Sequence, residues 1–160
     1  MKKLIFILVC ICMSTLVQAQ TWRETFLEGK AFYKKQDYKN AAIYYEKSLP
    51  LAEKEFGKES KSYAVSCNNL ASLYESQGSY AKAESLYVEA KNIYEKILGK
   101  EHPDYASCCN NLAGLYDSEG LYSKAEPLYL EAKNIREKVS GKEDPDYATS
   151  CNNLAVLYYK

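Results

Sequence analysis

Tyr63–Asp104 reads YAVSCNNLASLYESQGSYAKAESLYVEAKNIYEKILGKEHPD, and the next stretch is almost a copy of it. That stretch, Tyr105–Asp146, reads YASCCNNLAGLYDSEGLYSKAEPLYLEAKNIREKVSGKEDPD. Aligned without a gap, the two agree at 29 of 42 positions. A fixed internal period of this length is typical of repeat proteins, in which each repeat packs only against its neighbours.

The period extends in both directions. A diverged copy precedes the pair, in which Tyr38 matches Tyr80 and Gly57 matches Gly99, and a partial copy, YATSCNNLAVLYYK, follows it. The last copy has a first helix without a partner, so we expect the chain to be part of a longer array. The predicted repeats are 21–62, 63–104, 105–146 and 147–160.

Each full repeat predicts two helices separated by Gln77–Ser79 or its counterpart. The apolar residues of the first helix follow the i, i+3, i+4, i+7 spacing of one helical face: Cys67, Leu70, Ala71 and Tyr74. Those of the second helix alternate by three and four: Tyr80, Ala83, Tyr87, Ala90, Tyr94 and Ile97. A lone pair would expose these stripes and stacking buries them, so we predict an all-α protein, an α-solenoid of antiparallel helix pairs.

The links between repeats carry helix-ending and helix-starting residues. Gly99 and Gly141 stand where a left-handed C-cap is expected. Pro103 and Pro145 suit the first turn of the following helix, and Asp144 is a candidate N-cap.

The pattern resembles a known family. The residues that carry the resemblance are Leu70, Ala71, Tyr74, Gly78, Tyr80, Ala83, Tyr87 and Ala90, which look like the tetratricopeptide repeat. The NNLA segment and the GKEHPD link at Gly99–Asp104 are similar to the 42-residue variety found in kinesin light chains and many bacterial proteins. The resemblance implies a superhelix that binds proteins or peptides. The first repeat departs from it with Glu28 in place of leucine and Gln36 in place of glycine, as a capping repeat would tolerate.

A polar stripe lies opposite the apolar one on each first helix, by the 100° rotation per residue. In the family this side lines the concave groove, and groove asparagines hold peptide backbones. An asparagine amide is both donor and acceptor, so a row of them suits an extended peptide. The alternative is that these amides bond only to neighbouring helices or water. The expected groove residues are Asn68, Asn69, Ser72, Asn110, Asn111, Asn152 and Asn153.

The corresponding places in the first repeat are basic and aromatic: Arg23, Phe26, Leu27, Lys30, Tyr33 and Lys34. We include Arg23 and Lys30 among the groove residues, because they suit an acidic segment or a terminal carboxylate. The alternative is an ordinary solvated helix face.

Composition and motifs favour binding over catalysis. Lys+Arg and Asp+Glu both number 21, so the basic surplus of a nucleic-acid binder is missing. His102 is the only histidine, and we expect a helix cap or surface role for it, without metal, cofactor or catalytic set. The periodic Cys67, Cys109 and Cys151 fall on the core stripe and predict buried packing residues, whereas Cys108 has no obvious partner.

The amino terminus reads as a secretory signal. Lys2 and Lys3 precede a short apolar run, Leu4–Met13, and Val17–Ala19 suits a signal peptidase. We expect residues 1–19 to be removed and the product to be secreted or periplasmic, with no other membrane association. An uncleaved anchor is the alternative.

The predicted function is a scaffold that holds a protein or extended peptide. One alternative is a regulatory repeat region of a larger protein with a downstream protease-like domain, which the sequence after Lys160 would reveal. Another is self-association through the last helix, which sedimentation would detect. The sequence leaves the partner and the oligomeric state open.

Overall fold

The structure is a computed structural model, and it describes residues 20–160. The predicted signal segment, residues 1–19, lies outside the described residues. Within residues 20–160 the chain forms seven α-helices and no strand, which confirms the predicted all-α class. None of these helices is both long enough and apolar enough to cross a membrane.

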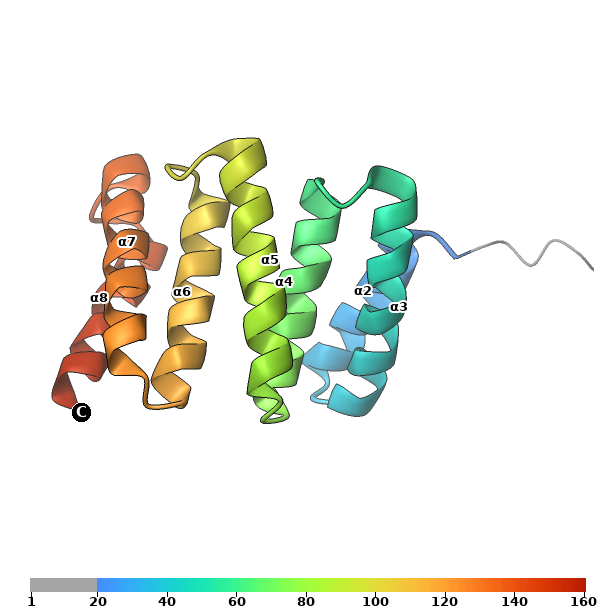
Figure 1. Ribbon diagram of the computed structural model, residues 1–160, viewed down its shortest axis with the longest axis horizontal. Coiled ribbons are helices and arrows are strands. Elements are labelled where there is room, and N and C mark those ends of the chain that lie inside the picture. Colours follow the sequence, from blue (N-terminus) through green and yellow to red (C-terminus); the bar gives the residue numbers. More distant parts are fainter. Residues whose placement is uncertain (1–19) are drawn as a thin grey trace, which may run out of the picture.

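The helices form a row of antiparallel pairs (Figure 1). Each helix packs against the helices that precede and follow it in the sequence. We call α2, α4, α6 and α8 the first-helix layer, and α3, α5 and α7 the second-helix layer. Successive first helices from α4 onward touch one another, whereas contacts between successive second helices are sparse. The bounds are α2 (Trp22–Lys34), α3 (Tyr38–Phe56), α4 (Lys61–Ser76), α5 (Tyr80–Leu98), α6 (Pro103–Ser118), α7 (Tyr122–Ser140) and α8 (Pro145–Tyr159).

Side-chain caps start the later first helices. The Asp144 side chain accepts hydrogen bonds from two backbone N–H groups of α8. His102 Nδ1 accepts from the backbone N–H of Asp104 at 3.1 Å, so the single histidine is a helix cap, as predicted. Pro103 and Pro145 occupy the first helical position, where the missing N–H has no intrahelical partner to lose.

The glycines that end the second helices differ from the predicted cap. Gly99 has φ 84° and ψ 164°, and Gly141 has φ 85° and ψ 173°. The positive φ was expected, but the left-handed helical ψ was not found, so that part of the prediction is wrong. This backbone region is open essentially to glycine alone. The extended ψ directs the chain away from the second helix toward the start of the next repeat.

A glutamine occupies a left-handed turn in the first repeat. Gln36 has φ 59° and is the only non-glycine residue with positive φ between residues 20 and 160. Gly78 and Gly120 stand at the same position of the later repeats, with φ 70° and 73°. A side chain in this conformation costs about 1–2 kcal/mol, because Cβ crowds the carbonyl oxygen that follows it.

Small residues and tyrosines interlock in the core. Ala83 and Ala90 have no exposed surface, and Tyr87 is 1% exposed. In the first repeat a Cβ on Gly29 would lie 2.7 Å from Cδ1 of Tyr45, so only glycine fits there. Close backbone approach and a large flat ring beside it fill the space at the density of a protein interior.

The interior first helices are buried on two sides, which the periodicity did not predict. Ser66 and Leu73 lie off the predicted stripe of α4, yet neither exposes any surface. The reason is that α4 packs against α5 of its own repeat and also against α3 of the preceding repeat. Leu73 belongs to the cluster that contains Phe26 and Tyr45.

We predict that Gln36→Gly raises the free energy of unfolding by about 1 kcal/mol, because relief of the left-handed strain outweighs the added chain entropy. The reciprocal variant Gly78→Gln should lower it by about 1–2 kcal/mol. A Cβ at Gly78 meets no atom within 4 Å, so any loss there is a backbone effect. Urea unfolding followed by circular dichroism measures both, and destabilisation by Gln36→Gly would contradict the prediction.

Candidate functional site

The predicted asparagines lie along the first-helix layer, on α4, α6 and α8. We call these residues together with Ser72 the asparagine strip. Asn152 is exposed, and the other members are half-buried: Asn68, Asn69, Ser72, Asn110, Asn111 and Asn153. The strip therefore presents amides to the surface while part of each side chain contacts protein.

Two pairs of amides bridge successive repeats. Asn111 Nδ2 donates to Asn68 Oδ1 at 3.1 Å, and Asn153 Nδ2 donates to Asn110 Oδ1 at 2.9 Å. We call these pairs rungs. Each rung joins the second asparagine of one first helix to the first asparagine of the preceding one. The alternative to peptide binding was that the amides bond to neighbouring helices or to water. Bonds to neighbouring helices are present in both rungs, and they orient the amides.

The first repeat supplies no rung. Asn69 would meet Phe26 if the pattern continued, and a phenyl ring offers no amide acceptor. Asn69 Nδ2 instead donates to the carbonyl oxygen of Val65 in its own helix, at 2.8 Å. Phe26 is 9% exposed and stacks on Trp22 with ring centroids 5.4 Å apart. The residue expected to line the groove is therefore part of the core.

The rungs leave hydrogen-bonding capacity unused. An asparagine amide has two N–H donors and an oxygen with two lone pairs. In each rung one amide donates a single N–H and the other accepts with its oxygen. The Asn68 oxygen also lies 3.7 Å from Cys108 Sγ. An oriented amide with free donors and acceptors can bond to a peptide backbone at little cost in side-chain entropy.

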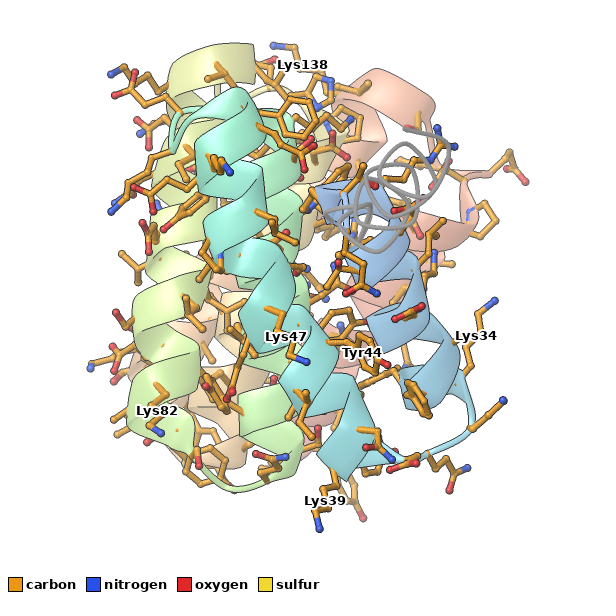
Figure 2. The ribbon with its side chains drawn as sticks, turned by 90° about the vertical axis from the view of Figure 1, so that its right-hand side faces the viewer. Lys34, Lys39, Tyr44, Lys47, Lys82 and Lys138 are labelled. Atoms are coloured by element: carbon orange, nitrogen blue, oxygen red, sulfur yellow. The ribbon has the colours of Figure 1, made fainter. Side chains whose placement is uncertain are left out.

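The basic residues of the first repeat are separate from the rungs. Arg23 and Lys30 on α2 are exposed. Figure 2 shows Lys34 at the end of α2, and Lys39, Tyr44 and Lys47 on α3 of the same repeat. Lys47 Nζ lies 5.6 Å from the centre of the Tyr44 ring. The structure places these cations at the amino-terminal end of the row, one repeat away from the paired asparagines.

The sequence analysis singled out one junction position through Cys108 but assigned it no role, because the position lies off both stripes. Ser66, Cys108 and Ser150 occupy it in successive repeats, and all are buried. Ser66 Oγ accepts from Trp22 Nε1 at 2.8 Å, and Ser150 Oγ accepts from Arg136 Nη1 at 2.7 Å. The only sequence signal was the recurrence of small residues at this position.

The cysteines behave as packing residues. Cys67 and Cys109 expose no surface, as predicted, whereas Cys151 is only partly buried. Cys108 is 2% exposed, and no disulfide joins the cysteines in residues 20–160. Burial raises the pKa of Cys67, Cys108 and Cys109 to about 12, which keeps these thiols protonated and poorly nucleophilic at neutral pH. The described residues hold no metal-ligating cluster.

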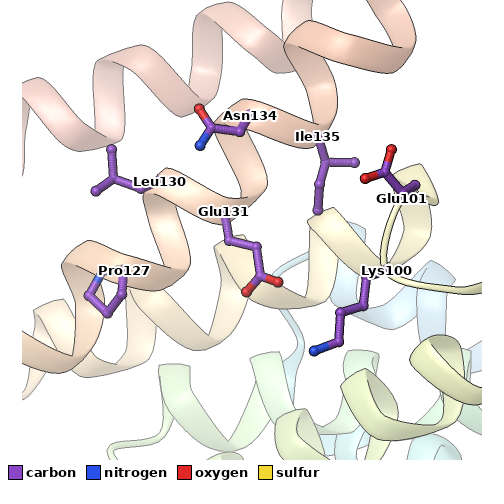
Figure 3. A pocket seen from close by; sticks show the side chains of 7 residues that line it. All are labelled: Lys100, Glu101, Pro127, Leu130, Glu131, Asn134 and Ile135. Carbon is purple, nitrogen blue, oxygen red and sulfur yellow. The ribbon is translucent and has the colours of Figure 1, made fainter.

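Two shallow hollows lie on the second-helix side and do not include the asparagine strip. Figure 3 shows the larger, of about 500 Å³, where α7 meets the loop between α5 and α6. Its lining residues are Lys100, Glu101, Pro127, Leu130, Glu131, Asn134 and Ile135. The smaller, of about 300 Å³, is lined by Leu49, Leu70, Tyr74, Lys82, Ser85 and Leu86. Each hollow has polar as well as apolar lining residues, among them Lys100 and Glu131 in the larger and Lys82 in the smaller.

We predict that Asn111→Ala lowers the free energy of unfolding by about 1 kcal/mol, because it removes the bond to Asn68. The double variant Asn68→Ala with Asn111→Ala should lose little more than either single variant, since both break the same bond. Asn92→Ala, at an exposed site on α5, is the matched control and should have no effect. Strictly additive losses in urea unfolding would show that the rung contributes nothing.

Comparison with known proteins agrees with this geometry. A family model described as "Tetratricopeptide repeat" matches residues 20–96 and again residues 64–138. A search among curated proteins found no match.

Several solved structures are similar. The crystal structure of BtubC (BKLC) from P. vanneervenii has a TM-score of 0.82 at 26% identity, over 90% of this chain and 59% of that one. A Podospora anserina protein described as a kinesin light chain with nearly identical TPR-like repeats has a TM-score of 0.77 at 24% identity, over 85% of this chain and 64% of that one. The N-terminal domain of stress-induced protein-1 from C. elegans has a TM-score of 0.58 at 16% identity, over 84% and 94%. This chain thus spans about three fifths of the first two proteins.

Proposed function

We propose that this chain, which belongs to the tetratricopeptide repeat family, binds an extended segment of another polypeptide along its asparagine strip. Repeats of this kind are typical scaffolds for protein–protein interaction. The single observation that carries the proposal is the pair of rungs, which hold amides of successive repeats in one orientation at half-buried sites.

The chemistry of the strip favours recognition of a peptide backbone. Backbone N–H and C=O groups recur along an extended chain, and amides are complementary to both. A rung already fixes its two side chains, so binding costs less rotamer entropy than it would with free asparagines. Such a strip would tolerate many ligand side chains, and it needs no nucleophile, acid–base pair or cofactor.

Asn69 provides the sharpest test. Among the residues that the structure describes, its amide bonds only to Val65 of its own helix, so removing it breaks no hydrogen bond between repeats. We predict that Asn69→Ala weakens binding of linear peptides, selected on the wild-type protein from a displayed random library, about five- to tenfold, as expected for one hydrogen bond. The melting temperature should hardly change. Fluorescence anisotropy with a labelled peptide measures the affinity.

Asn92→Ala is the control for this test, because Asn92 is exposed on the second-helix layer. Equal weakening by both substitutions, or a loss of affinity that follows a lower melting temperature, would contradict the proposed site. Selection of no peptide at all would contradict the proposed function.

We also propose that the protein is exported, on the strength of Lys2, Lys3 and the apolar run Leu4–Met13. The expected mature product begins at Gln20, two residues before α2 starts at Trp22. Amino-terminal sequencing of protein recovered from the exported fraction checks this expectation. A product that retains Met1 and stays with the membrane would favour an uncleaved anchor.

A further inference from the structure

Within residues 20–160, one buried cation has no anionic partner. Arg136, near the carboxyl end of α7, is 7% exposed. No carboxylate within residues 20–160 forms an ion pair with it, although ten other pairs with basic side chains occur there. Burying a guanidinium away from any negative charge is unfavourable, so its surroundings need explanation.

Neutral oxygens surround the guanidinium. Nη1 donates to Ser150 Oγ at 2.7 Å and to the backbone oxygen of Asp146 at 3.1 Å. Nη2 lies 3.4 Å from Ser107 Oγ, near the limit of a hydrogen bond. These contacts use three of the five N–H groups of an arginine. They orient the guanidinium between α6 and α8 without neutralising its charge, and two donors remain.

The position of this charge relates it to the asparagine strip. Ser107 precedes Asn110 by three residues on α6, and Ser150 precedes Asn153 by three residues on α8. Residues three apart share a helix face. Arg136 therefore bridges the same two helices as the Asn110–Asn153 rung, at residues that lie about 4.5 Å from the rung along each helix axis. A segment that bonds to this rung would pass close to the guanidinium.

The fold does not require a cation at this position. Tyr94 is the counterpart of Arg136 one repeat earlier, and it packs with Cys108 in the same core cluster. Tyr94 is 4% exposed, so a neutral ring fills the equivalent junction well. Among the positions that differ between two nearly identical repeats, this one exchanges a buried aromatic ring for a buried charge.

We propose that Arg136 binds a carboxylate of the polypeptide segment held along the asparagine strip. The inference rests on the proposed function and adds an acidic group to the ligand, placed beside the Asn110–Asn153 rung. A ligand carboxylate would replace the long contact to Ser107 and accept hydrogen bonds from the two remaining N–H groups of the guanidinium. Charge-assisted bonds to a fixed guanidinium are roughly twice as strong as neutral ones, and the low local dielectric reduces their screening.

The test compares acidic and neutral forms of one peptide. Peptides are selected on the wild-type protein from a displayed random library. Each is synthesised with its acidic residues intact and with Asn or Gln in their place, and each form has either a free or an amidated carboxyl terminus. The protein variant is Arg136→Tyr with Ser150→Cys, which recreates the Tyr94–Cys108 junction and should keep the fold. Arg136→Gln is a second neutral variant, and circular dichroism verifies folding.

For the wild-type protein, replacing the recognised carboxylate with an amide should raise the Kd by about tenfold or more. Both neutral variants should bind the acidic and amide forms equally. If the Arg136 variants lose the wild-type preference for the acidic side chains over Asn or Gln, the recognised group is an Asp or Glu. If they lose the wild-type preference for the free over the amidated carboxyl terminus, the recognised group is the end of the peptide. Asn69→Ala, by contrast, should weaken all forms alike and retain the preference.

The failures of the two proposals can be distinguished. If peptides bind with the same affinity in acidic and neutral forms, or if the preference survives in both Arg136 variants, the carboxylate site is overturned while the scaffold function stands. If the library yields no peptide, the proposed function is overturned, and the carboxylate site is overturned with it.

Discussion

Tyrosines with buried rings and bonded hydroxyls hold this solenoid together. Tyr87 is 1% exposed, and its hydroxyl donates to Glu75 at 2.9 Å. Tyr116 crosses from one repeat to the preceding one and donates to Glu84 at 2.6 Å. Burial raises the pKa of Tyr116 to about 12, so its hydroxyl remains a donor at neutral pH. The ring supplies apolar area for the core, and the hydroxyl supplies a directional hydrogen bond, which explains why 12 of the 16 tyrosines recur with the period.

This packing sets a constant offset between first helices, and the asparagine rungs depend on it. Both rungs join residues 43 positions apart, which is one period plus one residue. The ion pair between Lys61 and Asp104, at 2.6 Å, has the same separation. These three contacts between successive repeats therefore share one sequence offset. The core packing fixes how successive first helices lie against each other, so it also fixes the regular spacing of the amides. No loop is needed to position them.

The fold could be predicted from the sequence because its period is long, strict and locally consistent. The stripe from Cys67 to Tyr74 is buried or half-buried as expected. The rest depends on contacts that no single repeat encodes. A helical wheel of α4 places Ser66 and Leu73 off the stripe, and only the preceding repeat buries them.

The sequence was enough to expect the asparagines on one face of the first helices, but not the hydrogen bonds that they form. The asparagines lie on one face of the first-helix layer, but their mutual bonds depend on the offset between helices, which a wheel cannot supply. Asn69 illustrates the difference, because its conformation follows from the identity of Phe26 in another repeat. Arg136 was missed for a similar reason: its position belongs to the core stripe, where Tyr94 made an apolar residue the natural expectation.

The repeats are nearly alike, but they differ at the residues that pack one repeat against the next. At the first junction the counterpart of Tyr94 and Arg136 is the small residue Ala52. Trp22 packs into the same cluster there, and its indole N–H donates to Ser66. At the next junction Tyr94 fills that place opposite Cys108, and at the last Arg136 bonds to Ser150. If Tyr94 alone were replaced by arginine, a guanidinium would face the thiol of Cys108. If Arg136 alone were replaced by tyrosine, an aromatic ring would face Ser150. One variable pair at each junction thus distinguishes neighbouring repeats while the tyrosine and alanine framework stays constant, and at the last junction it places a charged group near the asparagine strip.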